Sequence, residues 1–153
     1  MKFSGYTLLT LFFAAGAGAA MAIQGAINSK LGKTIGLIES AIVVQAIGLI
    51  AGLAAFGIFW IYQGNSKFAA LGQAPWYSFL GGFLGVLILL GVVASIPPLG
   101  VGNATTSIVA AQLLTAFIID CFGLFGAKPV PIHWTKIFGL LLIAAGARLI
   151  LCK

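Results

Sequence analysis

The sequence predicts an all-α membrane protein with five transmembrane helices, and three observations lead to this prediction. The chain of 153 residues is 61% hydrophobic and only 7% charged, whereas about a quarter of a typical soluble sequence is charged. Its apolar residues occur in long runs, each near the roughly 20 residues that a helix needs to cross the membrane. Because lipid offers no hydrogen-bond partners to the backbone, runs of this length are helices and not the short strands of a barrel.

Breaks in the apolar pattern locate the five helices. Polar or Pro-containing segments lie at residues 28–33, 63–67, 97–98 and 127–131. We therefore expect helices at about residues 6–27, 35–62, 76–96, 99–124 and 134–151. The longest polar stretch, between Tyr62 and Trp76, is little more than a loop. The whole chain, 1–153, is thus predicted to be a single transmembrane domain.

Two of these helices have alternative interpretations. The first run, with Lys2 before it and small residues at 16–20, resembles a secretory signal. Because its apolar residues continue to Ile27, we favour a spanning helix. Pro97 and Pro98 interrupt an apolar run more than twice as long as one crossing needs, so we expect a tight hairpin there, at the membrane interface.

The basic residues predict no preferred orientation. Five crossings put the chain ends on opposite sides of the membrane, and orientation follows an excess of Lys and Arg in short loops. The N-terminal side receives Lys2, Lys67, Lys128 and Lys136, and the other side receives Lys30, Lys33, Arg148 and Lys153. With four on each side, we expect insertion in both orientations (dual topology). The alternative is that the equal division is accidental and a weaker signal fixes one orientation. The net charge of +6 is spread too thinly to predict a nucleic-acid partner.

Aromatic residues add a second sign of symmetry. All of the Trp and Tyr residues fall at the helix ends on the N-terminal side: Tyr6, Trp60, Tyr62, Trp76, Tyr77 and Trp134. Aromatic belts normally mark both membrane interfaces. Two protomers paired head to tail would supply both belts, which predicts an antiparallel homodimer of five-helix bundles.

Small residues at helical spacing predict close helix packing, because helices in lipid associate through surfaces that let their backbones approach. Gly139 and Gly146 lie on one stripe of the last helix. Similar pairs occur on the second helix (Gly48, Gly52) and the third (Gly81, Gly85), and Ala14, Gly18, Ala22 and Ala26 follow one another at four-residue spacing on the first.

Polar residues inside the spans are the candidates for a solute site, because such residues face the bundle interior or a water-filled path. Gln24 and Asn28 share one face of the first helix, and Thr105 and Gln112 share one stripe of the fourth. We expect these four to bind substrate. Gln45 of the second helix is also hard to explain as packing, whereas many Ser and Thr hydroxyls simply bond to their own helix.

The only two acids, Glu39 and Asp120, lie near helix ends. One interpretation makes them coupling carboxylates that respond to protons or cations. The other makes them partners in interfacial ion pairs, Glu39 with Lys33 or Arg148 and Asp120 with Lys128.

Catalytic and metal-ligand patterns are not apparent in the sequence. His133 is a lone histidine, and Cys121 and Cys152 are far apart. We therefore expect neither an enzyme nor a cofactor or metal site.

Several segments resemble the bacterial YdcZ-type proteins. They are 24–33, Leu37-Ile38-Glu39-Ser40-Ala41, Ile96-Pro97-Pro98-Leu99-Gly100, Ala111-Gln112-Leu113, 120–126 and the glycines from Gly139 to Gly146. The resemblance covers nearly the whole chain and implies membership of the drug/metabolite transporter (DMT) superfamily and a place in the bacterial inner membrane. Glu39, Gln112 and Asp120 fall where that family's pattern has similar residues.

The second half of the chain is also similar to the small multidrug resistance exporters. The likeness lies in the Ile-Pro-x-x-Gly segment, which implies a hinge at Pro97, Pro98 and Gly100, and in the last helix's glycines. Those exporters use a membrane-central Glu on their first helix, and residues 19–24 here contain no carboxylate. Cationic drug antiport is therefore not expected.

Together these observations predict a small secondary transporter that exports a small solute by alternating access as an inverted-symmetry homodimer. The alternatives are a dual-topology passive ion channel and an accessory membrane subunit with no transport of its own. The missing mid-membrane charge favours a neutral, weakly polar or zwitterionic solute, but the sequence specifies neither the solute nor the coupling ion.

Overall fold

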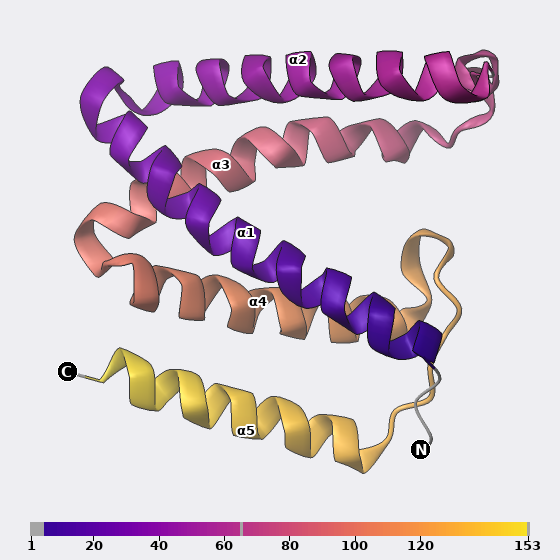
Figure 1. Ribbon diagram of the computed structural model, residues 1–153. Helices are drawn as coiled ribbons and strands as arrows, with labels where there is room; N and C mark the ends of the chain where they lie inside the picture. Colours follow the sequence, from indigo (N-terminus) through magenta and orange to yellow (C-terminus); the bar gives the residue numbers. More distant parts are fainter. Residues whose placement is uncertain (1–4, 65, 153) are drawn as a thin grey trace. The chain divides into compact units, whose positions relative to one another are not determined.

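A computed structural model describes residues 5–64 and 66–152 and confirms the predicted fold class (Figure 1). Within these residues the chain forms helices and no strands. The long helices are α1 (Gly5–Ile35), α2 (Leu37–Gln63), α3 (Leu80–Leu99), α4 (Val101–Phe122) and α5 (Trp134–Leu151). With the short helix η2 (Trp76–Phe79) counted as the start of the third span, five segments are long and apolar enough to cross a membrane. Lys2 and Lys153 lie outside the described residues.

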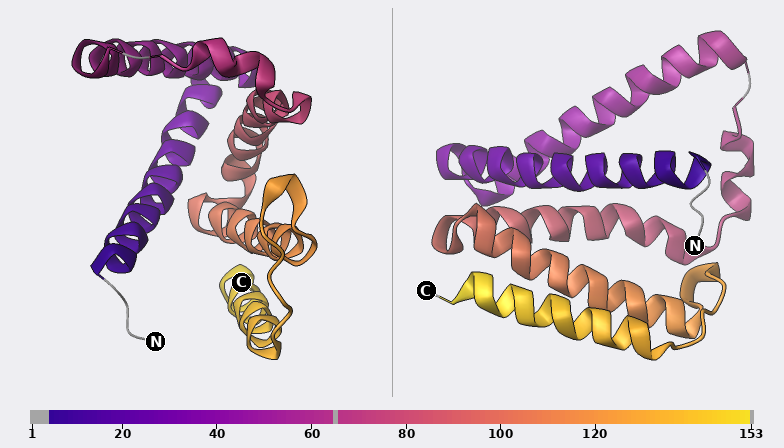
Figure 2. Two further views of the ribbon diagram at one scale, coloured as in Figure 1. Left: turned by 90° about the vertical axis from the view of Figure 1, so that its right-hand side faces the viewer. Right: turned by 60° about the horizontal axis from the view of Figure 1, so that its bottom comes forward.

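The chain divides into two compact units, Met1–Pro97 and Pro98–Lys153. In the first, α1 and α2 meet at a corner and separate toward their other ends, as both Figure 1 and the right-hand view of Figure 2 show. In the second, α4 and α5 lie side by side. The predicted single domain stays a prediction, as does the dimer.

The core of the first unit lies where α3 meets the corner between α1 and α2. Ala41 of α2 packs with Leu89 and Val93 of α3, all buried. α1 approaches the same face of α3 through its glycines. A Cβ atom at Gly25 would lie 3.1 Å from Val92 Cγ1, and one at Gly32 would clash with Val93. These two glycines therefore allow the close helix approach that the sequence pattern assigned to other small residues.

α1 is longer than predicted, because the expected break at 28–33 is helical. These residues are polar but include no proline, and Asn28 and Ser29 are buried instead of solvated. The helix of 31 residues is about 46 Å long, which exceeds the roughly 30 Å hydrocarbon core. Lys30 and Lys33 can therefore lie beyond the lipid while remaining helical.

Two glycines make the tight turns between consecutive helices. Gly36 (φ 103°, ψ 159°) separates α1 from α2, and Gly100 (φ 81°, ψ 159°) separates α3 from α4. This backbone region is essentially restricted to glycine. The turn expected at Pro97-Pro98 thus lies at Gly100, and both prolines belong to the last turn of α3. A proline's fixed φ of about −65° matches the helical value, although each proline removes one N–H donor from this turn. The hinge role of the prolines stays a prediction.

In the second unit, the connection between α4 and α5 folds back on the end of α4. Gly123, in the left-handed region (φ 61°), ends the helix two residues earlier than expected. The Val130 N–H donates to the Asp120 carbonyl at 2.9 Å. Along α5, a Cβ atom at Gly139 or Gly146 would meet no atom within 4 Å. Their role in packing therefore stays a prediction.

Candidate functional site

A pocket of about 260 Å³ lies among α1, α2 and α3, inside the first unit. The helices contribute its lining in unequal shares: Met21, Gln24, Gly25 and Asn28 from α1, Gln45 from α2, and Gly85, Ile88, Leu89 and Val92 from α3. The walls are therefore apolar except for three carboxamide side chains. This combination, an apolar cavity with a few polar groups, is typical of small-molecule sites.

Helical geometry explains how the three amides meet. Gln24 and Asn28 are four residues apart, so they lie one turn from each other on the same face of α1. Gln45 reaches the pocket from α2, and its Nε2 atom lies 3.6 Å from the position a Cβ of Gly85 would occupy. Gly85 of α3 thus lies directly opposite the Gln45 amide.

Asn28 is the most buried of the three, at 5% exposure. Among the described residues, no hydrogen bond is formed by its side chain or by those of Gln24 and Gln45. A carboxamide offers two donors and two lone pairs, and leaving such a group unpaired in a buried place costs about 1–3 kcal/mol. Since no fully enclosed side-chain nitrogen or oxygen of the described residues lacks a partner, the Asn28 amide is open to the pocket. Water or a solute there would supply its hydrogen bonds.

The pocket's lining contains no Lys, Arg, His, Asp or Glu. The three amides can donate to and accept from a solute, but the lining provides no counter-charge for an ion. Transferring a charged group into such an apolar place without a partner is costly. The lining therefore favours solutes that are neutral or zwitterionic.

Thr105 and Gln112, the predicted site residues of the fourth helix, belong to the second unit and are not among the pocket's lining residues. Thr105 is half-buried and Gln112 is exposed within the described chain. On α4, three hydroxyls donate to the backbone carbonyl four residues earlier, as the sequence analysis expected for many Ser and Thr residues. They are those of Thr106, Ser107 and Thr115. Thr105 forms no such bond in the described part of the chain, so its hydroxyl is free for another role.

The two carboxylates have different surroundings. Asp120 Oδ2 lies 3.7 Å from Lys136 Nζ, so its ion-pair partner is Lys136 and not the expected Lys128. Because both side chains are about half exposed, this pair contributes little to stability. Glu39 folds over Gly36 in the first turn of α2, where the helix dipole favours a negative charge. Within the described residues of the first unit it has no ion-pair partner, so the pairing expected with Lys33 is not formed. Arg148 belongs to the second unit, and its pairing with Glu39 stays a prediction.

Gln45 is the pocket residue that the predicted site omitted. The sequence analysis identified Gln45 as a polar residue that packing does not explain. Its position beside Gln24 and Asn28 depends on how α2 packs against α1 and α3, which the sequence pattern does not show. Gly85, opposite it, was interpreted only as a packing residue. A comparison of polar residues on one span with glycines on the next could have suggested that Gln45 and Gly85 lie opposite each other.

Residues 9–149 of the chain match the model of a family described as "Putative inner membrane exporter, YdcZ". No curated protein gives a significant match, and neither does any solved structure. The matched residues include all three amides of the pocket.

Proposed function

Because the chain belongs to the YdcZ family of inner-membrane exporters, we propose that it is a small secondary transporter that carries a neutral or zwitterionic solute through the pocket of α1, α2 and α3. The protein is a multi-pass membrane protein of the inner membrane. The observation that carries the proposal is Asn28, a buried amide that opens into an uncharged pocket without a hydrogen-bond partner. Such a group binds a solute that supplies the missing bonds.

The proposed mechanism is alternating access by an antiparallel homodimer. Two protomers related by a two-fold axis in the membrane plane have equivalent inward-facing and outward-facing states. The even division of basic residues and the placement of the Trp and Tyr residues near helix ends support this arrangement. Thr105 and Gln112, from the same chain or the partner, would complete the solute site, and Glu39 or Asp120 would supply any coupling to protons.

A panel of solutes tests the class of substrate. We expect neutral or zwitterionic solutes with several hydrogen-bonding groups to raise the melting temperature of the detergent-solubilised protein, because a ligand that binds only the folded state stabilises it. At 100 times its Kd, such a solute adds about 2.7 kcal/mol. Stabilisation by organic cations alone would contradict an uncharged site.

Cysteine labelling tests the antiparallel arrangement. Cys121 and Cys152 are free thiols, so both are first replaced by Ser, and a single Cys is then added at one end of the chain. We expect a membrane-impermeant thiol reagent to label about half of the protein in intact cells and the remainder only after the cells are opened, since the basic residues set no orientation. Labelling entirely from one face would exclude dual topology.

A further inference from the structure

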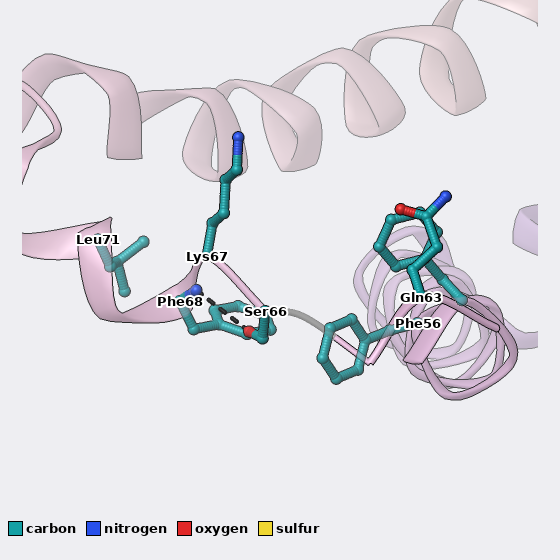
Figure 3. A pocket seen from close by; sticks show the side chains of 7 residues that line it. Phe56, Gln63, Ser66, Lys67, Phe68 and Leu71 are labelled. Carbon is teal, nitrogen blue, oxygen red and sulfur yellow. Dashed lines mark hydrogen bonds between the residues drawn. The ribbon is translucent and has the colours of Figure 1, made fainter. Parts of the chain in front are cut away.

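A second, larger pocket of about 680 Å³ lies where α2 ends, well away from the amide site. Its walls come from the last turns of α2, from Ser66 and Lys67, and from the short helix η1 (Phe68–Gln73). Seven residues line it (Figure 3): Phe56, Phe59, Gln63, Ser66, Lys67, Phe68 and Leu71. None of these residues belongs to the proposed solute pocket.

Aromatic rings form the apolar part of this pocket. The rings of Phe56 and Phe68 meet edge to face, with centroids 5.1 Å apart, and Trp60 lies 5.9 Å from Phe56 by the same measure. Phe68 and Leu71 nevertheless remain 64% and 54% exposed. In a chain that spans the membrane such side chains face lipid, so the apolar side of this hollow is open to acyl chains.

Lys67 gives the same pocket a positive charge that nothing in the described chain neutralises. The only two acids of the chain are Glu39, in the first turn of α2 and thus at its opposite end, and Asp120, which pairs with Lys136. Next to Lys67, the Ser66 hydroxyl oxygen accepts a hydrogen bond from the Phe68 N–H at 3.2 Å, which leaves its O–H able to donate. In Figure 3 the polar ends of Lys67 and Gln63 extend toward the same side of the view.

The place of the pocket along the chain defines its level in the membrane. Its residues lie at the end of one span and just before the next, in a part of the sequence that also contains Trp60 and Tyr62 and is followed by Trp76. Trp and Tyr at helix ends mark the headgroup level of the bilayer. A cation at this level beside an apolar hollow fits a molecule that carries an anionic group and a hydrocarbon chain together.

We propose that this pocket binds an anionic phospholipid. The phosphate lies at the Lys67 ammonium, with the Ser66 hydroxyl and the Gln63 amide as further donors, and one acyl chain lies against Phe56, Phe68 and Leu71. Basic residues at the membrane surface attract anionic lipids in this way. The site would serve as a lipid anchor for the loop between the second and third spans, and it does not depend on the transport proposal.

Tryptophan quenching tests this site directly, because Trp60 lies beside Phe56. A variant with Trp76→Phe and Trp134→Phe retains Trp60 as its only Trp. It is placed in two sets of phosphatidylcholine vesicles. One set contains brominated phosphatidylglycerol, and the other contains brominated phosphatidylcholine at the same mole fraction. We expect brominated phosphatidylglycerol to quench Trp60 more strongly, corresponding to about five-fold tighter binding, and Lys67→Gln to abolish the preference.

A matched control separates a site from general attraction to a charged surface. Lys128→Gln removes another exposed lysine, one that is outside this pocket, and should leave the preference unchanged. Equal quenching by the two lipids would overturn the proposal, as would an equal effect of Lys67→Gln and Lys128→Gln. The wild-type protein provides a second readout, since native mass spectrometry should find phosphatidylglycerol retained in preference to phosphatidylcholine.

Discussion

Replacing Asn28 with Leu is expected to reduce solute transport by about 10-fold to 100-fold. Leucine has the same number and branching of side-chain heavy atoms but removes both the donors and the acceptor of the buried amide, so the solute's polar groups would be left unpaired in the pocket. This range of rates corresponds to about 1.4–2.8 kcal/mol, which lies within the cost of about 1–3 kcal/mol for an unpaired buried group. The measurement is uptake of labelled solute into vesicles that contain equal amounts of the wild-type or variant protein.

A second amide provides the control for this change. Gln73, at the end of η1, lies outside both pockets and is exposed, so Gln73→Leu should transport at the wild-type rate. Asn28→Leu should also keep its melting temperature, because leucine relieves the cost of an unpaired buried amide. Wild-type transport by a folded Asn28→Leu protein would remove this pocket from the solute's path.

Adding a single methyl group at Gly32 is expected to destabilise the first unit. The Cβ of Gly32→Ala would clash with Val93, which is 4% exposed and has little room to move. Overpacking of this kind costs about 1–3 kcal/mol, more than the up to about 1 kcal/mol that alanine gains over glycine in a helix. A lower melting temperature in detergent would report the loss.

The same helix offers a control and a rescue for the Gly32 change. A Cβ atom at Gly18 would meet nothing within 4 Å, so Gly18→Ala should leave the melting temperature unchanged or slightly raised. In the double variant Gly32→Ala, Val93→Ala, the clash is removed. The double variant should therefore lose less free energy of unfolding than the two single variants lose in total. Strictly additive effects would mean that α1 and α3 do not touch at this point.

Much of the fold could be predicted from the sequence, because lipid constrains a spanning segment strongly. The number of spans follows from the lengths of the apolar runs alone. Helix ends were harder to predict. Residues 28–33 resemble a loop by polarity, yet they continue α1, because Asn28 and Ser29 find a buried environment that a single helix cannot reveal. Similarly, Pro97 and Pro98 resemble a turn by composition, whereas both continue α3, and the backbone conformation that favours glycine occurs at Gly100.

The candidate site was predicted in part. Periodicity placed Gln24 and Asn28 on one face of α1, and the structure brings both into one pocket. Periodicity along one helix cannot predict which residue of another helix lies opposite, and for this reason Gln45 was omitted. Whether Thr105 and Gln112 belong to the same site depends on contacts between units, which no pattern within α4 encodes. Their part in binding remains a prediction.

We expect this protein alone to move a neutral or zwitterionic solute by binding it in an alternating site, and a counterflow experiment shows whether it does. Vesicles that contain only the purified protein are loaded with an unlabelled solute that stabilises it and are diluted into a trace of the labelled solute. We predict that the label accumulates transiently above its external concentration, without an electrical current. Simple equilibration of the label, a steady ionic current, or no uptake at all would contradict the claim.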